Sequence, residues 1–249
     1  MVGRHMDRRS AAGPPAIGIR VLLPIDAPSM VDTAGTILVM TAPTRAALSR
    51  ELIAHTALLI TDAEGLSGLS MRKLGNELGV EAMSLYHYVD NKDDLLDAML
   101  DSLYAEIELP VDVPDEDWES AIRRGLHSFH DVLVRHPAAL ELFASRPGKS
   151  EHSLRILLWC YGRFQSVGLD VAQSVKALHF GVSFVMGHVA SELGAMASIA
   201  AGDGIDLEAI EDRALAELIT QRRTVTSGQM FNAGLEAVVA GLRAAFELP

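Results

Sequence analysis

Apolar residues recur at helical spacing along most of the chain, and few segments alternate apolar with polar residues as half-buried strands do. Leu48, Leu52 and Leu59 form the first of these series. Thr44 is placed to cap its N-terminus and Gly65 to end it. The pattern therefore predicts a first helix of about five turns between Thr44 and Gly65, and it favours an all-α fold.

Three shorter helices are expected next, each bounded by a capping or helix-ending residue. Their predicted ranges are Met71–Leu78, about Glu81–Val89 and about Asn91–Glu108, the last capped by Asn91 or Asp90. Ser70 precedes the first of them and Gly79 ends it, so only a tight turn separates it from the next helix. Two short helices joined in this way form the helix-turn-helix pattern, whose second helix enters the DNA major groove.

A linker is predicted at residues 110–114 (PVDVP), where two prolines alternate with acidic and apolar residues. Helices are expected after it at about 117–136, 137–144, 150–167, 170–197, 207–220 and 229–246, with a loop at 202–204. The predicted domains are a disordered leader at 1–43, a helix-turn-helix DNA-binding domain at 44–96 with a linking helix to about 108, and a ligand-binding and dimerisation domain at 115–249. A cloning remnant could supply the opening MVGRHM.

The second helix of the pair carries side chains suited to DNA. Ala82, Met83 and Ser84 are short enough at its N-terminal end to let the backbone approach base edges. Tyr86 and Tyr88 could donate hydrogen bonds to phosphates along its flank. Taken alone, these rings could equally form a solvated helix face or part of the core, but the Asn-Lys turn that follows favours DNA contact.

The stretch from Leu69 to Leu96 (LSMRKLGNELGVEAMSLYHYVDNKDDLL) resembles the DNA-binding region of tetracycline-repressor (TetR) family regulators. The string LY, then V, NK and a Leu-Leu helix carries most of that resemblance, which covers about residues 44–96. It implies a double-stranded operator as partner and assigns DNA contacts to Arg72, Ser84, Tyr86, Tyr88 and Lys92. The full candidate set is Arg72, Ala82, Met83, Ser84, Tyr86, His87, Tyr88 and Lys92.

Most of the remaining chain is similar to the regulatory domain of the repressor for which the family is named. The matching residues, in order, are Trp118, Ser128-Phe129, His136, Ser145-Arg146-Pro147, Gly181, Phe184, Gly187 and Phe231–Glu236. This likeness implies a homodimer through about residues 170–197 and 229–246 and an unknown small-molecule effector. The candidate effector contacts are Phe129, Leu142, Phe143, Trp159, Phe184, Met186 and His188, although periodicity does not show whether they enclose a cavity.

Departures from the tetracycline repressor change the expected ligand. Its metal-binding His falls here on Leu142 or Phe143, its drug-contacting His on Glu108, and an Asn of the next helix on Gly125. The acid on its long helix matches Ser191 or Glu192. We therefore expect no magnesium-tetracycline complex to bind in that manner, and we predict no cofactor.

Net charge qualifies the DNA prediction without removing it. The chain carries a formal charge of −12, which opposes phosphate contacts, but residues 44–95 hold five Lys or Arg against eight Asp or Glu. No apolar run reaches the roughly 18 uncharged residues of a spanning helix; the longest candidate, around 177–190, contains His179 and His188. These features favour a cytoplasmic protein without a membrane partner, and Cys160 is expected to be a buried structural thiol.

Catalytic and metal sites are not predicted. His127 and His130, three residues apart, could be metal ligands with His179 and His188, but packing or surface roles are favoured because no suitably spaced acid or Cys accompanies them. The favoured function is a ligand-responsive regulator, most simply a repressor. Two alternatives remain: a small-molecule-sequestering dimer without specific DNA binding, and an enzyme using His127, His130 or Glu141.

Overall fold

The computed structural model describes residues 48–109, 116–201 and 212–248. The chain divides into two units, residues 1–46 and 47–249, and every described element belongs to the second. The predicted leader, linker and 202–204 loop lie outside the described residues, so the domain boundaries stay predictions.

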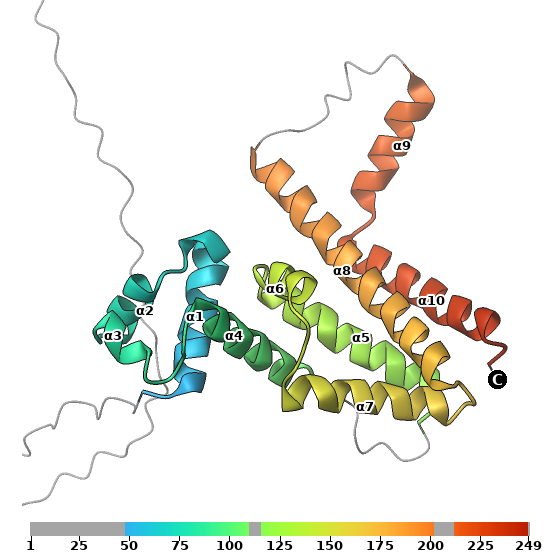
Figure 1. Ribbon diagram of the computed structural model, residues 1–249. Coiled ribbons are helices and arrows are strands. Elements are labelled where there is room, and N and C mark those ends of the chain that lie inside the picture. Colours follow the sequence, from blue (N-terminus) through green and yellow to red (C-terminus); the bar gives the residue numbers. More distant parts are fainter. Residues whose placement is uncertain (1–47, 110–115, 202–211, 249) are drawn as a thin grey trace, which may run out of the picture. The chain divides into compact units, whose positions relative to one another are not determined.

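Helices account for all the regular structure of the described residues, as predicted (Figure 1). In chain order they are α1 Arg50–Glu64, the 3-10 turn η1 Leu66–Gly68, α2 Met71–Leu78, α3 Ala82–Leu85, α4 Lys92–Glu106, α5 Trp118–Arg135, α6 Ala139–Ser145, α7 Glu151–Gln165, α8 Val171–Ala201, α9 Arg213–Thr224 and α10 Ser227–Ala245. The fold class is therefore all-α.

Two predicted boundaries among the first four helices were wrong, and the helix predicted at about 207–220 is found at Arg213–Thr224. Helix α1 begins at Arg50 and not near Thr44, because the Ser49 hydroxyl accepts the Leu52 N–H and caps the helix there. Helix α3 ends at Leu85 and does not reach Val89. After it, backbone N–H groups bond three residues back, so the chain tightens into successive turns.

Helix α4 is shared by two packed groups of helices. It packs against α1 on one side and against α6 and α7 on the other. Its buried residues run the whole length of the helix, from Leu95 to Leu103. The Asn91 side chain caps its start by accepting the Asp94 N–H, and Asp93 and Asp94 occupy its first turn, where the helix dipole favours acids.

Helix α8 is the longest helix of the described residues and is largely apolar. By length and composition, residues Val171–Ser198 could cross a membrane, although such a helix is also common in protein cores. Here the helix packs on α5, α7 and α10, and it buries Ala177, Val185 and Val189. Only 17% of that apolar window is buried, however, and Phe180 and Met196 stay exposed, so packing among the described residues accounts for only part of its apolar character.

Candidate functional site

Helices α2 and α3 form a tight helix-turn-helix unit that depends on two glycines. Gly79 ends α2 in the left-handed conformation, with φ of 66°. Gly75 is buried inside α2, and a Cβ atom there would lie 2.9 Å from the Val80 carbonyl oxygen and 3.1 Å from the Ala82 nitrogen. The two helices can therefore approach this closely only because residue 75 has no side chain.

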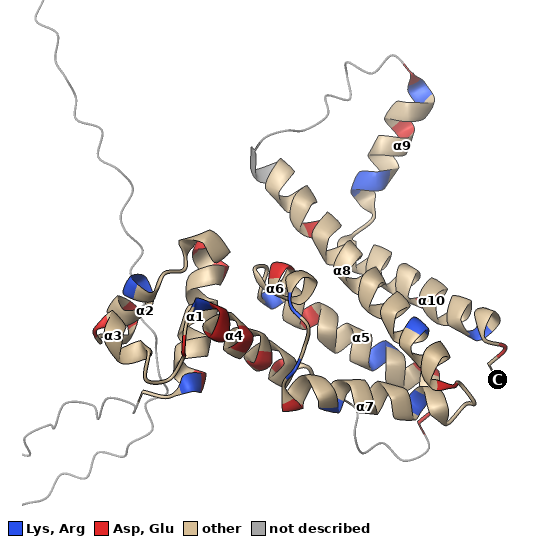
Figure 2. Ribbon diagram, viewed as in Figure 1, with Lys and Arg blue, Asp and Glu red and all other residues tan. Residues whose placement is uncertain are grey.

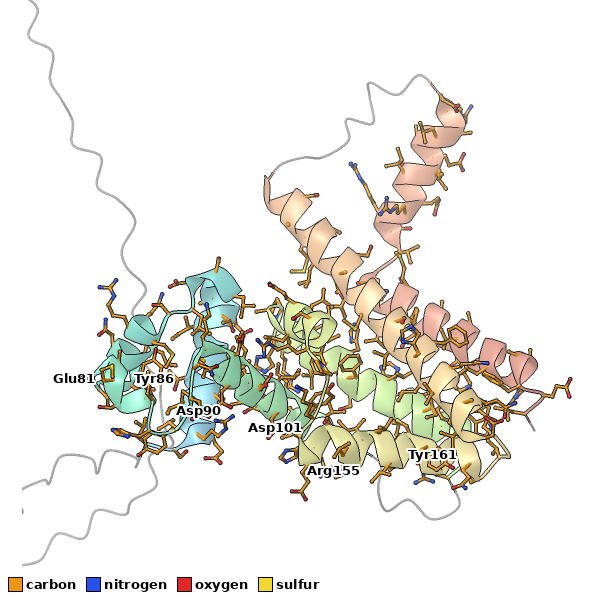
Figure 3. All side chains as sticks on the ribbon, viewed as in Figure 1. Glu81, Tyr86, Asp90, Asp101, Arg155 and Tyr161 are labelled. Carbon is orange, nitrogen blue, oxygen red and sulfur yellow. The ribbon has the colours of Figure 1, made fainter. Side chains whose placement is uncertain are left out.

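The predicted DNA contacts gather on the exposed side of this unit. Met83 is 72% exposed, Tyr86 42% and Tyr88 40%, whereas Leu85 is completely buried and holds α3 to the core. Arg72, His87 and Lys92 are also exposed, and Ala82 and Ser84 are half-buried. Glu81 and Tyr86, at the two ends of α3, bracket this surface (Figure 3).

Most basic side chains near this surface already have protein partners. Arg50 forms a bidentate pair with Asp94 at 2.5 and 2.7 Å, and this pairing lowers the pKa of the Asp94 carboxyl. Lys73 pairs with Glu64, and Lys92 Nζ donates to the Leu69 carbonyl at 3.1 Å. Among the described basic residues of this region, Arg72 makes no hydrogen bond or ion pair within the protein. Its guanidinium is the one most available to a phosphate.

Lys92 therefore differs from the simple phosphate contact that was predicted. Its ammonium links the start of α4 to the segment before α2, and so it also supports the fold of the unit. An ammonium has three donors, so one bond to a carbonyl leaves capacity for a phosphate.

A row of ion pairs joins the helices of the DNA-binding part to the regulatory helices. Its acidic members lie mainly along α4 (Figure 2). Arg146 bonds Asp93 at 2.5 Å and Asp97 at 2.6 Å, and His152 Nδ1 lies 2.8 Å from the Asp101 carboxylate. Shifts of α4 therefore change contacts on both sides of this junction.

A second junction contact involves the end of α5. His136 lies between the carboxylates of Asp62 on α1 and Glu106 on α4, at 2.7 and 3.2 Å. Burial raises the pKa of Asp62, and the bond to His136 opposes that rise. One carboxylate oxygen of Asp62 is buried without a partner, so this contact is less complete than the Arg146 pairs.

An apolar cavity of about 100 Å³ lies among α4, α5, α6, α7 and α8. Its walls include Tyr104, Ile107, Leu109, Ile122, Gly125, Leu126, Phe129, Phe143, Ile156, Trp159, Cys160, Phe164, Ala177, Leu178, Gly181 and Val182. None of these side chains carries a formal charge. The Trp159 Nε1–H is buried without a hydrogen-bond partner, which leaves one donor available to a bound molecule.

Two cavity-lining groups have altered acidity. Burial raises the pKa of the Cys160 thiol to about 12, so this cysteine stays protonated at neutral pH and is a poor nucleophile. Burial also raises the pKa of Tyr104. The cavity is therefore uncharged at physiological pH.

The structure divides the predicted effector contacts into two groups. Phe129, Phe143 and Trp159 line the cavity, with Phe129 and Phe143 packed edge to face at 5.1 Å. The remaining predicted contacts, Leu142, Phe184, Met186 and His188, are not among the residues that line it. Leu142 directly precedes Phe143 on α6 and is fully buried in the core.

Helix α10 explains the position of two of the others. Phe184 stacks on Phe231 of α10 at 5.6 Å, over Gly234, where a Cβ would come within 2.4 Å of its ring. His188 faces the same helix, with Nε2 3.2 Å from the Ser227 hydroxyl, and burial lowers its pKa. These side chains hold α8 to α10 instead of facing the cavity.

Sequence reasoning missed the contribution of α4 to the cavity. Tyr104 and Ile107 were assigned to a linking helix, and Leu109 directly follows its predicted end. Their apolar spacing continues the buried face of α4, so the sequence contains the signal for burial. The sequence does not indicate which other residues would surround these three side chains.

Comparison with known proteins supports both regions. Residues 53–99 match the family described as bacterial regulatory proteins, tetR family, and residues 109–246 match the tetracyclin repressor-like C-terminal domain. The chain is 34% identical to the HTH-type transcriptional repressor DrrR1 of Streptomyces coeruleorubidus, over 59% of this chain and 54% of that protein. It is 27% identical to the class D tetracycline repressor of Escherichia coli, over 79% and 89%. The chain thus spans only about half of DrrR1.

Solved structures show the same fold. The TetR family protein ActR of Streptomyces coelicolor in complex with actinorhodin matches with a TM-score of 0.65 and 27% identity, covering 80% of this chain and 99% of that one. A variant TetR of Acinetobacter baumannii in complex with minocycline matches with a TM-score of 0.63 and 26% identity, covering 79% and 94%. Both relatives were solved with a small molecule bound.

Proposed function

The chain belongs to the TetR family of bacterial regulatory proteins, and from that premise we propose that it is a transcriptional repressor released from its operator by a small-molecule effector. One observation carries the proposal: a helix-turn-helix unit with an exposed reading face and a separate apolar cavity share helix α4. The same cavity-lining helix thus connects an effector to DNA.

DNA binding is assigned to the exposed side of α2 and α3. Ala82, Met83 and Ser84 would approach base edges, while Tyr86, Tyr88 and Arg72 would bond the backbone phosphates. His87 and Lys92 would lie at the margin of this contact. Few basic groups are free, so affinity depends on shape and hydrogen bonds as well as on charge, and binding to arbitrary DNA should be weak.

The effector is expected to be largely apolar and to carry a hydrogen-bond acceptor. The cavity walls offer aromatic and aliphatic surface, and the unpaired Trp159 N–H offers a donor. Pockets for drug-sized ligands measure about 300–1,000 Å³, so a cavity of about 100 Å³ must widen to admit one. Phe129 and Phe143 would contact the effector together with Trp159.

Widening of the cavity supplies the switch. Tyr104 of α4 and Ile107, which directly follows that helix, form part of its wall. The same helix packs against α1, and Lys92 at its start bonds the Leu69 carbonyl just before α2. A ligand that enlarges the cavity favours a different position of α4, and thereby separates the two reading units of a dimer from successive major grooves. A coupling of about 1–3 kcal/mol between effector and operator is typical of such systems.

The dimer is proposed to form through α8 and α10, where apolar side chains remain exposed. Phe180 is 54% exposed, Met196 62% and Met230 42%. A second copy would bury these side chains in a four-helix arrangement of two α8 and two α10 helices. The regulator would work in the cytoplasm, where its DNA is.

A magnesium-tetracycline complex is not the proposed effector. Phe143 lines the cavity and Leu142 is fully buried, so neither candidate position for the relative's metal-binding His supplies an imidazole. An enzymatic role is also disfavoured: His127, His130 and Glu141 are not among the residues that line the cavity. A sequestering dimer without DNA binding remains the main competing function.

The decisive experiment measures binding of the full chain to DNA fragments that flank its own coding region, by fluorescence anisotropy across a salt series. The wild type should bind one fragment far more tightly than the others. Arg72→Ala should weaken binding about tenfold and reduce the salt slope by about 1, as expected for one lost phosphate contact. Tyr86→Ala should weaken it as well.

The matched control is Arg155→Ala, which removes the same charge from an exposed position on α7 (Figure 3). It should bind like the wild type. Weak binding of equal strength to every fragment would contradict the repressor proposal and favour the sequestering dimer.

A further inference from the structure

Three side chains with metal-binding atoms converge on one point between α5 and α8. They are His130 of α5 and His188 and Glu192 of α8, and their potential ligand atoms all lie within 4.8 Å of one another. The Glu192 Oε2 atom lies 3.7 Å from His130 Nε2 and 3.9 Å from His188 Nε2. This group is separate from the apolar cavity, whose walls include none of the three.

The atoms that face one another are buried and lack hydrogen bonds. His130 Nε2 and Glu192 Oε2 are both inaccessible to solvent and have no hydrogen-bond partner. Buried polar atoms are normally paired, because leaving one unpaired costs about 1–3 kcal/mol. Two such atoms facing each other across 3.7 Å, which is too long for a hydrogen bond, indicate that a positive charge belongs between them.

The surroundings of His130 favour a metal ion as that charge. Its other ring nitrogen, Nδ1, lies 3.3 Å from the Asp131 carboxylate. A proton on Nδ1 satisfies this contact and leaves Nε2 with a free lone pair directed toward Glu192. A carboxylate on the outer nitrogen of an imidazole is the usual support of a metal-binding histidine.

We propose that His130, His188 and Glu192 bind a divalent metal ion of the zinc type. Two imidazoles and one carboxylate are a common zinc ligand set, with an open fourth position. Bonds of about 2.0–2.2 Å in tetrahedral geometry place ligand atoms about 3.4 Å apart. The separations from Glu192 exceed this by a few tenths of an ångström, and the three ligand atoms all lie within 4.8 Å of one another, so side-chain rotations that draw them together would complete the site.

The site would fasten α5, α8 and α10 together. Phe231 of α10 stacks on the His130 ring with centroids 4.0 Å apart. The Ser227 hydroxyl lies 3.2 Å from His188 Nε2 in the metal-free site, and a bound metal would replace that hydrogen bond at the nitrogen. Side-chain exposures of 13–22% leave the metal a route in from solvent. The inference rests on these contacts alone and does not depend on the protein being a repressor.

Zinc titration of the metal-free full chain tests the proposal. Isothermal calorimetry should show one Zn²⁺ bound per chain with micromolar or tighter affinity, and Co²⁺ should give the visible absorption bands of a tetrahedral site. His188→Gln and Glu192→Gln should each weaken Zn²⁺ binding at least tenfold, the low end of what a lost ligand contact costs. The matched control His179→Gln changes an exposed histidine of the same helix and should bind like the wild type.

Thermal unfolding separates loss of the site from loss of the fold. Zn²⁺ should raise the Tm of the wild type and of His179→Gln in a concentration-dependent way, but not that of the other two variants, which should still unfold cooperatively. Equal zinc binding by all four proteins would place the metal elsewhere and overturn the proposal. No binding by the wild type would also overturn it and would leave a plain His130–Glu192 ion pair.

Discussion

The DNA-binding helices and the regulatory helices build their functional surfaces in opposite ways. The reading face comes from one continuous stretch, residues 69–96, held in shape by caps, a left-handed Gly79 and the buried Gly75. The cavity instead takes its walls from five helices spread over residues 104–182. The first surface therefore depends on backbone geometry, and the second on how separate side chains pack.

The largest effect should come from adding a methyl group at Gly75. In Gly75→Ala, the new Cβ would meet backbone atoms of Val80 and Ala82, which cannot rotate away as a side chain would. We expect a loss of about 1–3 kcal/mol in the free energy of unfolding and near-complete loss of operator binding. Urea unfolding and anisotropy measure the two effects.

Gly162→Ala is the matched substitution in the regulatory part. Nothing lies within 4 Å of its added Cβ on α7, so the better helix propensity of Ala should stabilise the protein by up to about 1 kcal/mol. Equal changes in the free energy of unfolding for Gly75→Ala and Gly162→Ala would show that the helix-turn-helix unit tolerates an added methyl group as well as α7 does.

A smaller effect of opposite sign is expected from filling the cavity. Ala177→Leu adds three carbons at a cavity-lining position that is 1% exposed. Filling such a space commonly gains about 0.5–2 kcal/mol, which corresponds to a Tm rise of about 2–4 °C per kcal/mol in a chain of this size. DNA affinity should stay unchanged, while release by an effector should be lost.

Its control is Ala172→Leu, on the same helix but exposed. That change should alter stability by less than about 0.5 kcal/mol. A lower Tm for Ala177→Leu than for this control would indicate that the cavity cannot accept the added carbons.

The smallest effects concern two carboxylates with opposite pKa changes. The pKa of Asp94 is lowered by Arg50, so its stabilising contribution is present above pH 3.8 and is lost as pH falls through the lower folded pKa. Asp94→Asn should therefore cost about 0.5–1 kcal/mol at pH 7, and progressively less as pH falls below 3.8.

Asp62 provides the contrasting case at the junction. Burial raises its pKa, so its contribution is present below pH 3.8 and is lost as pH rises through the folded pKa. Asp62→Asn should change stability at pH 7 by only about 0.5 kcal/mol. Urea unfolding from pH 2.5 to 7 tests both predictions. A larger loss of unfolding free energy at pH 7 for Asp62→Asn than for Asp94→Asn would contradict them.

The sequence was most informative where structure is local. The all-α fold and the family were predicted correctly, because caps, glycines and the string from Leu69 to Leu96 act over a few residues. It failed where two local signals competed: Thr44 and Ser49 are both residue types that cap helices, and α1 begins at the Ser49 cap. The assignment of individual DNA contacts stays a prediction.

Sites assembled from distant helices could not be derived in the same way. Periodicity places both Leu142 and Phe143 inside the protein, but the rotation of α6 decides which of them reaches the cavity. The histidines were paired with one another in the sequence, and metal was rejected for lack of an acid. Glu192, one helical turn after His188, was considered only as a match to the acid of the tetracycline repressor, and packing of α5 on α8 brings His130 to it.

The shared helix α4 has a consequence for how this protein can be recombined with others. Because one continuous helix supplies core residues to both parts, α4 cannot be assigned to either part alone. A chimera that joined a foreign regulatory part at the start of α4 would have to recreate the Arg146 contacts, and one joined after Ile107 would have to recreate the cavity wall. The DNA-binding part and the effector-binding part can therefore be exchanged only together. New effector specificities are more accessible through substitutions in the cavity than through exchange of one part.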